Sequence, residues 1–152
     1  MVMNEKKNNL WDFVKFAVIA ILIVMPIRFW VAQPFIVSGS SMVPTFKNGD
    51  YLIVDELSYQ FHAPKKNDVV VFRYPYDTSK FFIKRITGLP GETVNTLSGE
   101  ITLGENEYFV EGDNAPQSSD SRVWGPLNKN FIVGKTLVRL WPLNKIGISF
   151  NK

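Results

Sequence analysis

Three serines crowd around a glycine in the segment SGSSMVPTF, residues 38–46, which ends in an apolar Met42 and a rigid Val43-Pro44 pair. A serine becomes a nucleophile only when a base removes its hydroxyl proton. Without such a base, a cluster of Ser and Gly is typical of an ordinary loop. The first question is therefore which base this chain offers.

Two side chains could act as that base. His62 is the one histidine of the chain, and its surroundings, FHAPKK, favour a solvated loop residue. Lys84 lies in FFIKRI, residues 81–86, a predicted strand on which it shares a face with Phe82 and Ile86. Such apolar neighbours would partly desolvate the lysine and lower its pKa, which must fall from about 10.4 to roughly 7–8 before a neutral amine is useful. The alternative is an edge lysine that keeps the strand from aggregating.

A third polar cluster, EGDNAPQSSDSRVWG, occupies residues 111–125. An exposed Asp–Arg pair in a surface loop would contribute little to stability. The functional alternative is a polar network that supports a buried charge. The residues alone leave both interpretations open.

The composition excludes several other kinds of site. The 152 residues include no cysteine, which excludes disulfides, cysteine nucleophiles and thiolate metal ligands. A single histidine argues against zinc and other His-rich centres, so we expect neither a metal nor another cofactor. The net charge of +3 comes with no stripe of Lys and Arg, which argues against a nucleic-acid partner.

The N-terminal part of the chain has the pattern of a membrane anchor. Residues 16–27 carry no charge, and residues 10–31 would cover roughly 33 Å as a helix, enough for a bilayer core. Small residues in an A-x-A arrangement are absent near its end, which favours an uncleaved anchor over a cleaved signal peptide or a buried core helix. Three lysines precede or open the stretch and one arginine closes it, so the positive-inside rule keeps the N-terminus in the cytoplasm.

The residues after Pro34 have the pattern of an all-β domain. Short apolar runs alternate with Gly, Pro and Asn, and no stretch keeps a 3.6-residue apolar period. The predicted strands are residues 35–37, 51–55, 69–74, 81–86, 93–97, 100–103, 108–110 and 131–141.

These patterns predict a mainly β protein: an antiparallel β-sheet or barrel-like domain preceded by one N-terminal transmembrane helix. The expected divisions are a cytoplasmic N-terminus at residues 1–9, an anchor at 10–33 and an extracytoplasmic β domain at 34–152. Such a chain would be a single-pass protein of the cell membrane, with the lipid bilayer as one partner.

Together, the three clusters resemble the type I signal peptidases of bacteria, which are membrane-anchored serine proteases with a Ser–Lys dyad. The motifs that carry the resemblance are SGSSMVPT, FFIKRITGLPGE and EGDNAPQSSDSRVWG, in that order behind a hydrophobic N-terminal segment. The resemblance covers residues 27–141. Serine-Met-x-Pro-Thr alone is a weak signal, but the three motifs in order are a strong one.

The resemblance implies a role for several residues. Ser41, immediately before the motif methionine, matches the family's nucleophile, and Lys84 matches its general base. Ser118 matches a serine that orients the lysine. Asp120 and Arg122 match residues that brace that loop.

The resemblance also implies an oxyanion site. The family's donor is the backbone N–H of the nucleophile, here Ser41. Some members add a hydroxyl two residues earlier, where this chain has Gly39. Ser40 would point to the other side of an extended chain, so it is not expected to replace that hydroxyl.

The substrates implied are exported preproteins with small residues at the first and third positions before the cut. Such a peptide would bind extended, pairing its main chain with the strand edges at residues 37–40 and 82–84. Shallow apolar pockets would accept the small side chains. The expected pocket residues are Ile36, Val37, Met42, Phe82, Ile83 and Ile86.

The motifs allow three other interpretations. A peptidase of the same fold dedicated to one substrate class, such as a pilus or conjugation subunit, is compatible with every residue above. A catalytically silent relative that acts as an assembly chaperone is disfavoured because Ser41 and Lys84 are both present. A repressor autoprotease of the SOS type is disfavoured because the N-terminus has no DNA-binding helix-turn-helix pattern.

Overall fold

A computed structural model describes the backbone of residues 5–30 and 32–148, with the side chains of residues 10–25 and 33–147. The helices are α1 (Glu5–Trp30), α2 (Ser58–Phe61) and α3 (Ser121–Trp124), with single 3₁₀ turns η1 (Ala115–Gln117), η2 (Lys129–Phe131) and η3 (Leu143–Lys145). The strands are β1 (Ala32–Ile36), β2 (Tyr51–Asp55), β3 (Val69–Tyr74), β4 (Asp77–Gly88), β5 (Thr93–Thr96), β6 (Gly99–Thr102), β7 (Glu107–Glu111), β8 (Leu127–Asn128), β9 (Ile132–Trp141) and β10 (Gly147–Ile148).

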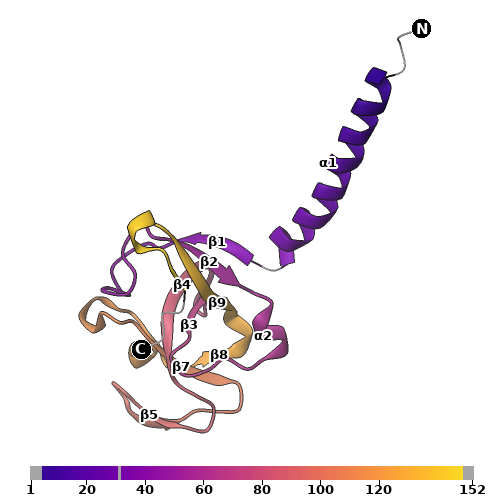
Figure 1. Ribbon diagram of the computed structural model, residues 1–152. Helices are drawn as coiled ribbons and strands as arrows, with labels where there is room; N and C mark the ends of the chain where they lie inside the picture. The colour runs from indigo at the N-terminus through magenta and orange to yellow at the C-terminus, as the bar shows by residue number, and fades with distance from the viewer. Residues whose placement is uncertain (1–4, 31, 149–152) are drawn as a thin grey trace.

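One antiparallel sheet holds most of these strands together. Its order is β1-β2-β9-β3-β4-β7-β8, with β10 paired to β9, and β5 and β6 form a separate hairpin. The sheet curls, because Phe35 on β1 contacts Phe81 on β4 although three other strands separate β1 from β4 in the sheet. Figure 1 shows this curled sheet with α1 extending away from it. The prediction of a mainly antiparallel β domain is confirmed.

The two faces of the sheet bury two separate hydrophobic clusters. β3 is the central strand, and its run of valines and Phe72 is buried on both faces, as expected for a continuous apolar strand. One cluster consists of Val70, Phe72, Ile86, Tyr108, Val110 and Leu127. The other consists of Val37, Met42, Phe46, Leu52 and Val69, with Ile83 packed against it.

The long strand β4 changes its surroundings along its length. Its first part pairs with β3 alone, and pairing with β7 begins at Arg85. The edge of β4 that faces away from β3 is therefore not paired with any strand of the described sheet from Asp77 up to Lys84. β1 has a second such edge, because it pairs with β2 alone.

The predicted strands all appear, with differences at their ends. β4 begins at Asp77, four residues earlier than predicted, because Asp77 pairs with Tyr74 across a tight turn. The first strand lies at Ala32–Ile36, earlier than the predicted 35–37. The four-residue helices α2 and α3 were not predicted, since one helical turn leaves no apolar period to detect.

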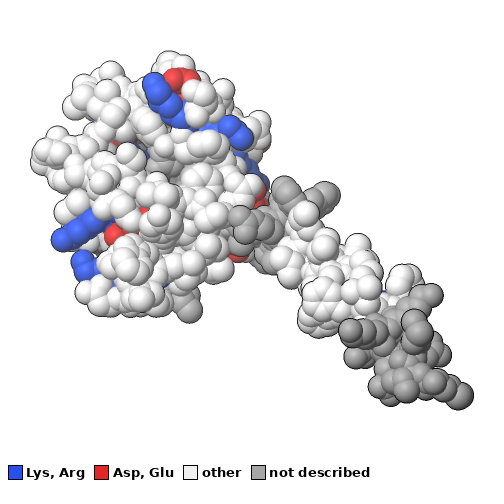
Figure 2. All heavy atoms as spheres, turned by 90° about the horizontal axis from the view of Figure 1, so that it is seen from above, with Lys and Arg blue, Asp and Glu red and all other residues white. Residues whose placement is uncertain are grey.

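Helix α1 occupies the stretch predicted as an anchor. Large apolar side chains between residues 10 and 25 are exposed, among them Phe13 at 68% and Leu22 at 67%. Figure 2 shows little charge on the described surface of this helix, in contrast to the Lys and Arg side chains on the β domain. Among the described residues, no helix is both long enough and apolar enough to qualify as a membrane span.

Candidate active site

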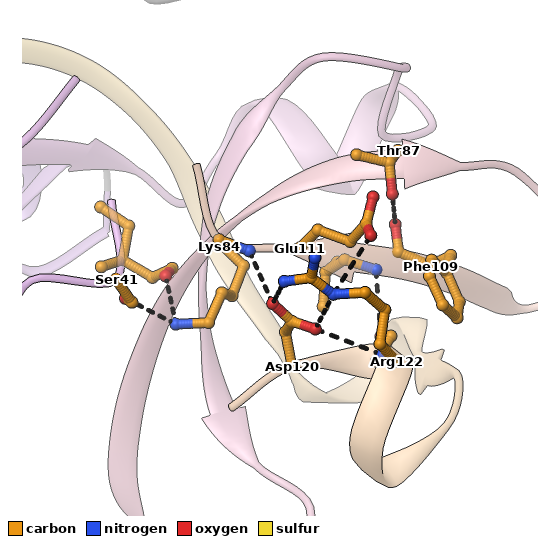
Figure 3. A network of polar contacts seen from close by, with 11 residues as sticks. Ser41, Lys84, Thr87, Phe109, Glu111, Asp120 and Arg122 are labelled. Atoms are coloured by element: carbon orange, nitrogen blue, oxygen red, sulfur yellow. Dashed lines mark hydrogen bonds and ion pairs between the residues drawn. The ribbon is translucent and has the colours of Figure 1, made fainter. Parts of the chain in front are cut away.

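The structure brings Ser41 and Lys84 together from segments 43 residues apart. Ser41 lies in the turn-rich connection between β1 and β2, and Lys84 lies on β4. Lys84 Nζ is 2.9 Å from Ser41 Oγ and donates a second hydrogen bond to the Ile83 carbonyl oxygen at 3.0 Å. Figure 3 shows the two side chains pointing toward each other. When the amine is neutral, the same short distance lets it accept the hydroxyl proton.

The surroundings of Lys84 favour its neutral form. The residue is 4% exposed, and burial lowers the pKa of its amine to about 8 although the Asp120 carboxylate raises it in part. The Phe82 ring lies 5.3 Å from Nζ, and cation–π attraction on that scale is smaller than the effect of burial. A fall from 10.5 to about 8 disfavours the ammonium by on the order of 3 kcal/mol. An amine with this pKa would be suited to act as a base near neutral pH.

A buried carboxylate lies behind the dyad. Asp120 is fully buried and accepts from Arg122 Nε at 2.8 Å and Nη2 at 2.6 Å, and from the Gly112 N–H at 3.0 Å. Burial raises the pKa of Asp120, but these donors more than offset it, so the pKa lies below the ordinary value. Arg122 also contacts Glu111 at 3.3 Å (Figure 3). Of the two interpretations of the third motif, the structure therefore agrees with the buried polar network and not with an exposed Asp–Arg pair.

Ser118 lies in the same network without the predicted contact to Lys84. Its Oγ is buried and makes no hydrogen bond of normal geometry to a described residue. It packs against Gly112, where a Cβ would collide with both the Ser118 side chain and the Ser41 carbonyl oxygen. The expected hydrogen bond to Lys84 is therefore not formed in this arrangement.

Backbone contacts fix the segment that carries Ser41. Asn114 N–H donates to the Ser41 carbonyl oxygen at 2.9 Å, and Asn114 Nδ2 donates to the Ser40 carbonyl oxygen at 3.1 Å. Ser40 Oγ turns away from the dyad and donates to Gln117 at 2.8 Å. With its carbonyl oxygen held in this way, Ser41 keeps its backbone orientation.

Gly39 lies two residues before Ser41 and fixes the backbone of the same segment from its N-terminal side. Its φ of 93° lies in the region that favours glycine, and its N–H donates to Asn48 Oδ1 at 3.0 Å. The Ser41 N–H donates to no described residue. A free N–H beside a nucleophilic hydroxyl is the feature that an oxyanion site requires.

A cleft of about 520 Å³ opens in front of Ser41 and Lys84. Four of the predicted pocket residues line it, namely Ile36, Val37, Phe82 and Ile83. Ser38, from the predicted edge at residues 37–40, also lines it, as do residues that the sequence did not indicate: Phe35, Leu52, Val71, Lys80, Phe81, Gln117 and Ser119. Of these, Phe35 lies on β1, and Lys80 and Phe81 lie on β4.

Two predicted pocket residues lie elsewhere. Met42 is 1% exposed and Ile86 is fully buried, and neither lines the cleft. Met42 packs in the cluster with Phe46, because the chain turns inward directly after Ser41. Ile86 shares the face of Lys84 but comes after β7 has begun to cover β4. Both predictions for the pocket were wrong.

A buried ion pair beside the dyad was missed by the sequence interpretation. Arg85 Nε and Nη2 donate to the two carboxylate oxygens of Asp113 at 2.9 and 2.8 Å, and both side chains are nearly inaccessible. Thr45 Oγ1 donates to the same carboxylate. The pair joins the serine segment, the lysine strand and the third motif. Its sequence signals were an arginine immediately after the lysine and an aspartate in the third motif, and neither indicated that the two would pair.

Comparison with known proteins gives the family of the chain. Residues 10–104 and 95–141 match the family model described as "Signal peptidase, peptidase S26". The chain is 33% identical to "Probable signal peptidase I-1" of Synechocystis sp., over 90% of this chain and 87% of that protein. It is 32% identical to "Signal peptidase I" of Leptolyngbya laminosa, over 92% and 84%.

A solved structure is also similar. The crystal structure of a signal peptidase I from Enterococcus faecalis V583 is 25% identical and covers 49% of this chain and 97% of that one, with a TM-score of 0.43. The family match and the relatives cover most of the chain from its N-terminal helix to β9. The chain belongs to the signal peptidase family, peptidase S26, whose members are serine endopeptidases.

Proposed function

We propose that this chain is a membrane-anchored endopeptidase that removes signal peptides from exported preproteins, with Ser41 as nucleophile and Lys84 as general base. The observation that carries the proposal is the 2.9 Å approach of Lys84 Nζ to Ser41 Oγ within a buried site. The relatives named signal peptidase I support the substrate class. Neither a metal nor another cofactor takes part in this mechanism.

Acylation begins when neutral Lys84 takes the hydroxyl proton of Ser41. The Ser41 oxygen forms a bond to the scissile carbonyl carbon, and the Ser41 N–H stabilises the resulting oxyanion. One such donor is worth about 2.7–4 kcal/mol. The C–N bond then breaks as Lys84 returns the proton to the leaving amine, which is the new N-terminus of the mature protein.

Deacylation repeats the same steps with water. Lys84, neutral again, takes a proton from a water molecule whose oxygen attacks the ester carbon. The bond to Ser41 Oγ breaks, Lys84 gives the proton to that oxygen, and the signal peptide leaves with a free carboxylate. Asp120 and Arg122 hold the loop behind Lys84, and Ser118 fills the space beside Gly112.

The substrate lies extended between the free edges of β1 and β4. Both edges line the cleft, so a peptide placed there adds a strand by main-chain pairing. Ile36, Val37, Phe82 and Ile83 then contact its side chains. Ser41 and Lys84 also line the cleft, and the scissile bond would lie beside them.

The test of this proposal is cleavage of a preprotein. The detergent-solubilised chain, incubated with a preprotein that has alanine at the first and third positions before the cut, should release one product whose mass places the cut after the last alanine. Ser41→Ala should release none. Ser79→Ala, an exposed hairpin serine that contacts Asp77, is the matched control and should cleave like the native chain. Cleavage by Ser41→Ala at the native rate would contradict the assignment of the nucleophile.

The proposal includes α1 as a single-pass anchor, with its N-terminus in the cytoplasm and the β domain outside. Its support is the apolar surface of α1, the lysine bias at its N-terminal end and the start of β1 directly after it. Ten residues from position 31 to Ser41 reach at most about 33–36 Å when fully extended. Ser41 would therefore work near the outer membrane surface.

Removal of the anchor should separate two activities. A chain that starts at Pro34 keeps Ser41 and Lys84, so we expect it to cleave short peptides but to cleave a preprotein in liposomes much more slowly than the full chain. The exposed Trp141, Leu143 and Ile146 should also make it depend on detergent. The measurement is the cleavage rate of the full and the shortened chain on both substrates, the short peptide and the preprotein in liposomes. Equal rates on the liposome-bound preprotein would show that α1 does not position the site.

A further inference from the structure

The cleft has a third wall besides the edges of β1 and β4. Gln117 and Ser119, both from the third motif, line it together with residues of the two strands. Gln117 is the last residue of the 3₁₀ turn η1, and Pro116 directly before it restricts the backbone of that turn. This third wall belongs to neither of the strand edges along which the residues before the cut would lie.

The side-chain amide of Gln117 is tied to the residue next to Ser41. Ser40 Oγ donates to Gln117 Oε1 at 2.8 Å, and the Gln117 N–H donates to the Asn114 carbonyl oxygen at 3.0 Å. The other half of the amide, the Nε2 group, donates to no described residue. Gln117 therefore presents an oriented amide whose oxygen is occupied and whose N–H donors are free.

Strand pairing determines where a bound substrate must leave the sheet. β7 takes the edge of β4 from Arg85 onward, where Arg85 pairs with Glu111. A substrate strand on that edge can therefore extend only as far as Lys84. After Glu111 the chain leaves β7 and reaches the serine segment, where the Asn114 N–H donates to the Ser41 carbonyl oxygen. The substrate chain past the cut must turn away from β4 at this point, and there it passes the third wall.

We infer that the Gln117 side-chain amide donates a hydrogen bond to a main-chain carbonyl oxygen of the substrate just past the cut. This inference rests on the proposed function, in which the residues before the cut lie along β1 and β4, and adds a contact on the leaving-group side. Ser40 orients the amide by occupying its oxygen, which leaves the Nε2 group for the substrate. Every preprotein has a main-chain carbonyl at this place, so the contact holds the mature part of the substrate without selecting its side chains.

Two substitutions at Gln117 and one elsewhere separate this contact from other effects. Gln117→Glu keeps the size of the side chain and an oxygen acceptor for Ser40, but the carboxylate has no N–H to donate. Gln117→Ala removes both the donor and the acceptor. Gln60→Ala is the matched control, because Gln60 is an exposed glutamine on α2 that does not line the cleft.

The test compares kcat/KM for two substrates with the same residues before the cut. One is a peptide that continues past the cut, and the other is a methyl ester that ends at the cut and so offers Gln117 no carbonyl oxygen there. The ratio of the peptide value to the ester value should fall about three- to tenfold in both Gln117→Ala and Gln117→Glu, and should keep its native value in Gln60→Ala.

The ratio also distinguishes a substrate contact from damage to the serine segment. Such damage would slow cleavage of the peptide and the ester by the same factor and leave the ratio unchanged. An unchanged ratio in both Gln117 variants would therefore overturn the inference and leave the proposed function standing. Failure of the native chain to cleave the peptide would contradict the proposed function itself, and this inference with it.

Discussion

Replacing Ser41 or Lys84 by alanine should lower kcat/KM for preprotein cleavage by a similar factor, on the order of 10⁴ or more, and the double variant should lose little beyond either single one. The reason is that one proton transfer across the 2.9 Å contact involves both residues. Either single substitution already abolishes this transfer, so the second substitution removes no further catalytic interaction. The measurement is single-turnover cleavage by all three variants at equal concentration.

Matched controls separate this result from damage to the fold. Ser79→Ala and Lys66→Ala alter an exposed serine and an exposed lysine that do not line the cleft, and both should retain native kinetics. If the fold-losses in kcat/KM of the two single variants multiply in the double variant, Ser41 and Lys84 act in separate steps. That result would contradict a Ser–Lys dyad.

Asp113→Ala should destabilise the folded chain by about 3–5 kcal/mol, because it leaves the guanidinium of Arg85 buried without the carboxylate that it binds at two points. It should also slow cleavage, since Asp113 precedes Asn114, whose two hydrogen bonds hold the Ser41 segment. Urea unfolding followed by tryptophan fluorescence gives the free energy of unfolding.

A double substitution distinguishes loss of the pair from loss of packing. Arg85→Met combined with Asp113→Leu replaces both charges by apolar groups and should cost less than Asp113→Ala alone. Lys66→Ala breaks the exposed contact to Glu92 and should leave the unfolding midpoint nearly unchanged. A small effect of Asp113→Ala, equal to that of Lys66→Ala, would mean that the buried pair does not hold the three segments together.

The sequence was informative wherever the signal is local. The alternation of apolar residues located the strands, and the position of Lys84 between Phe82 and Ile86 indicated its desolvation before any partner was known. Resemblance to a family supplied Ser41, Asp120 and Arg122. These residues belong to short motifs whose meaning does not depend on the rest of the fold.

The missed features depend on contacts between distant segments. Strand alternation placed Ile86 on the face of Lys84 correctly, but it could not show that β7 covers β4 from Arg85 onward. The Arg85–Asp113 pair and the contact of Phe35 with Phe81 join residues that are 28 and 46 positions apart. Such pairs follow from the curl of the sheet, which no pattern within a single strand encodes.

The pH dependence of kcat/KM tests the Ser–Lys assignment most directly. Burial lowers the pKa of Lys84 to about 8, and the mechanism uses the neutral amine. The rate should therefore rise about tenfold per pH unit below that value and level off above it. His62→Gln should leave this acidic limb in place, because His62 is exposed and contacts only the Ser58 carbonyl oxygen among the described residues. An acidic limb near pH 8 in both chains is the predicted result, and a limb that disappears with His62 would contradict Lys84 as the base.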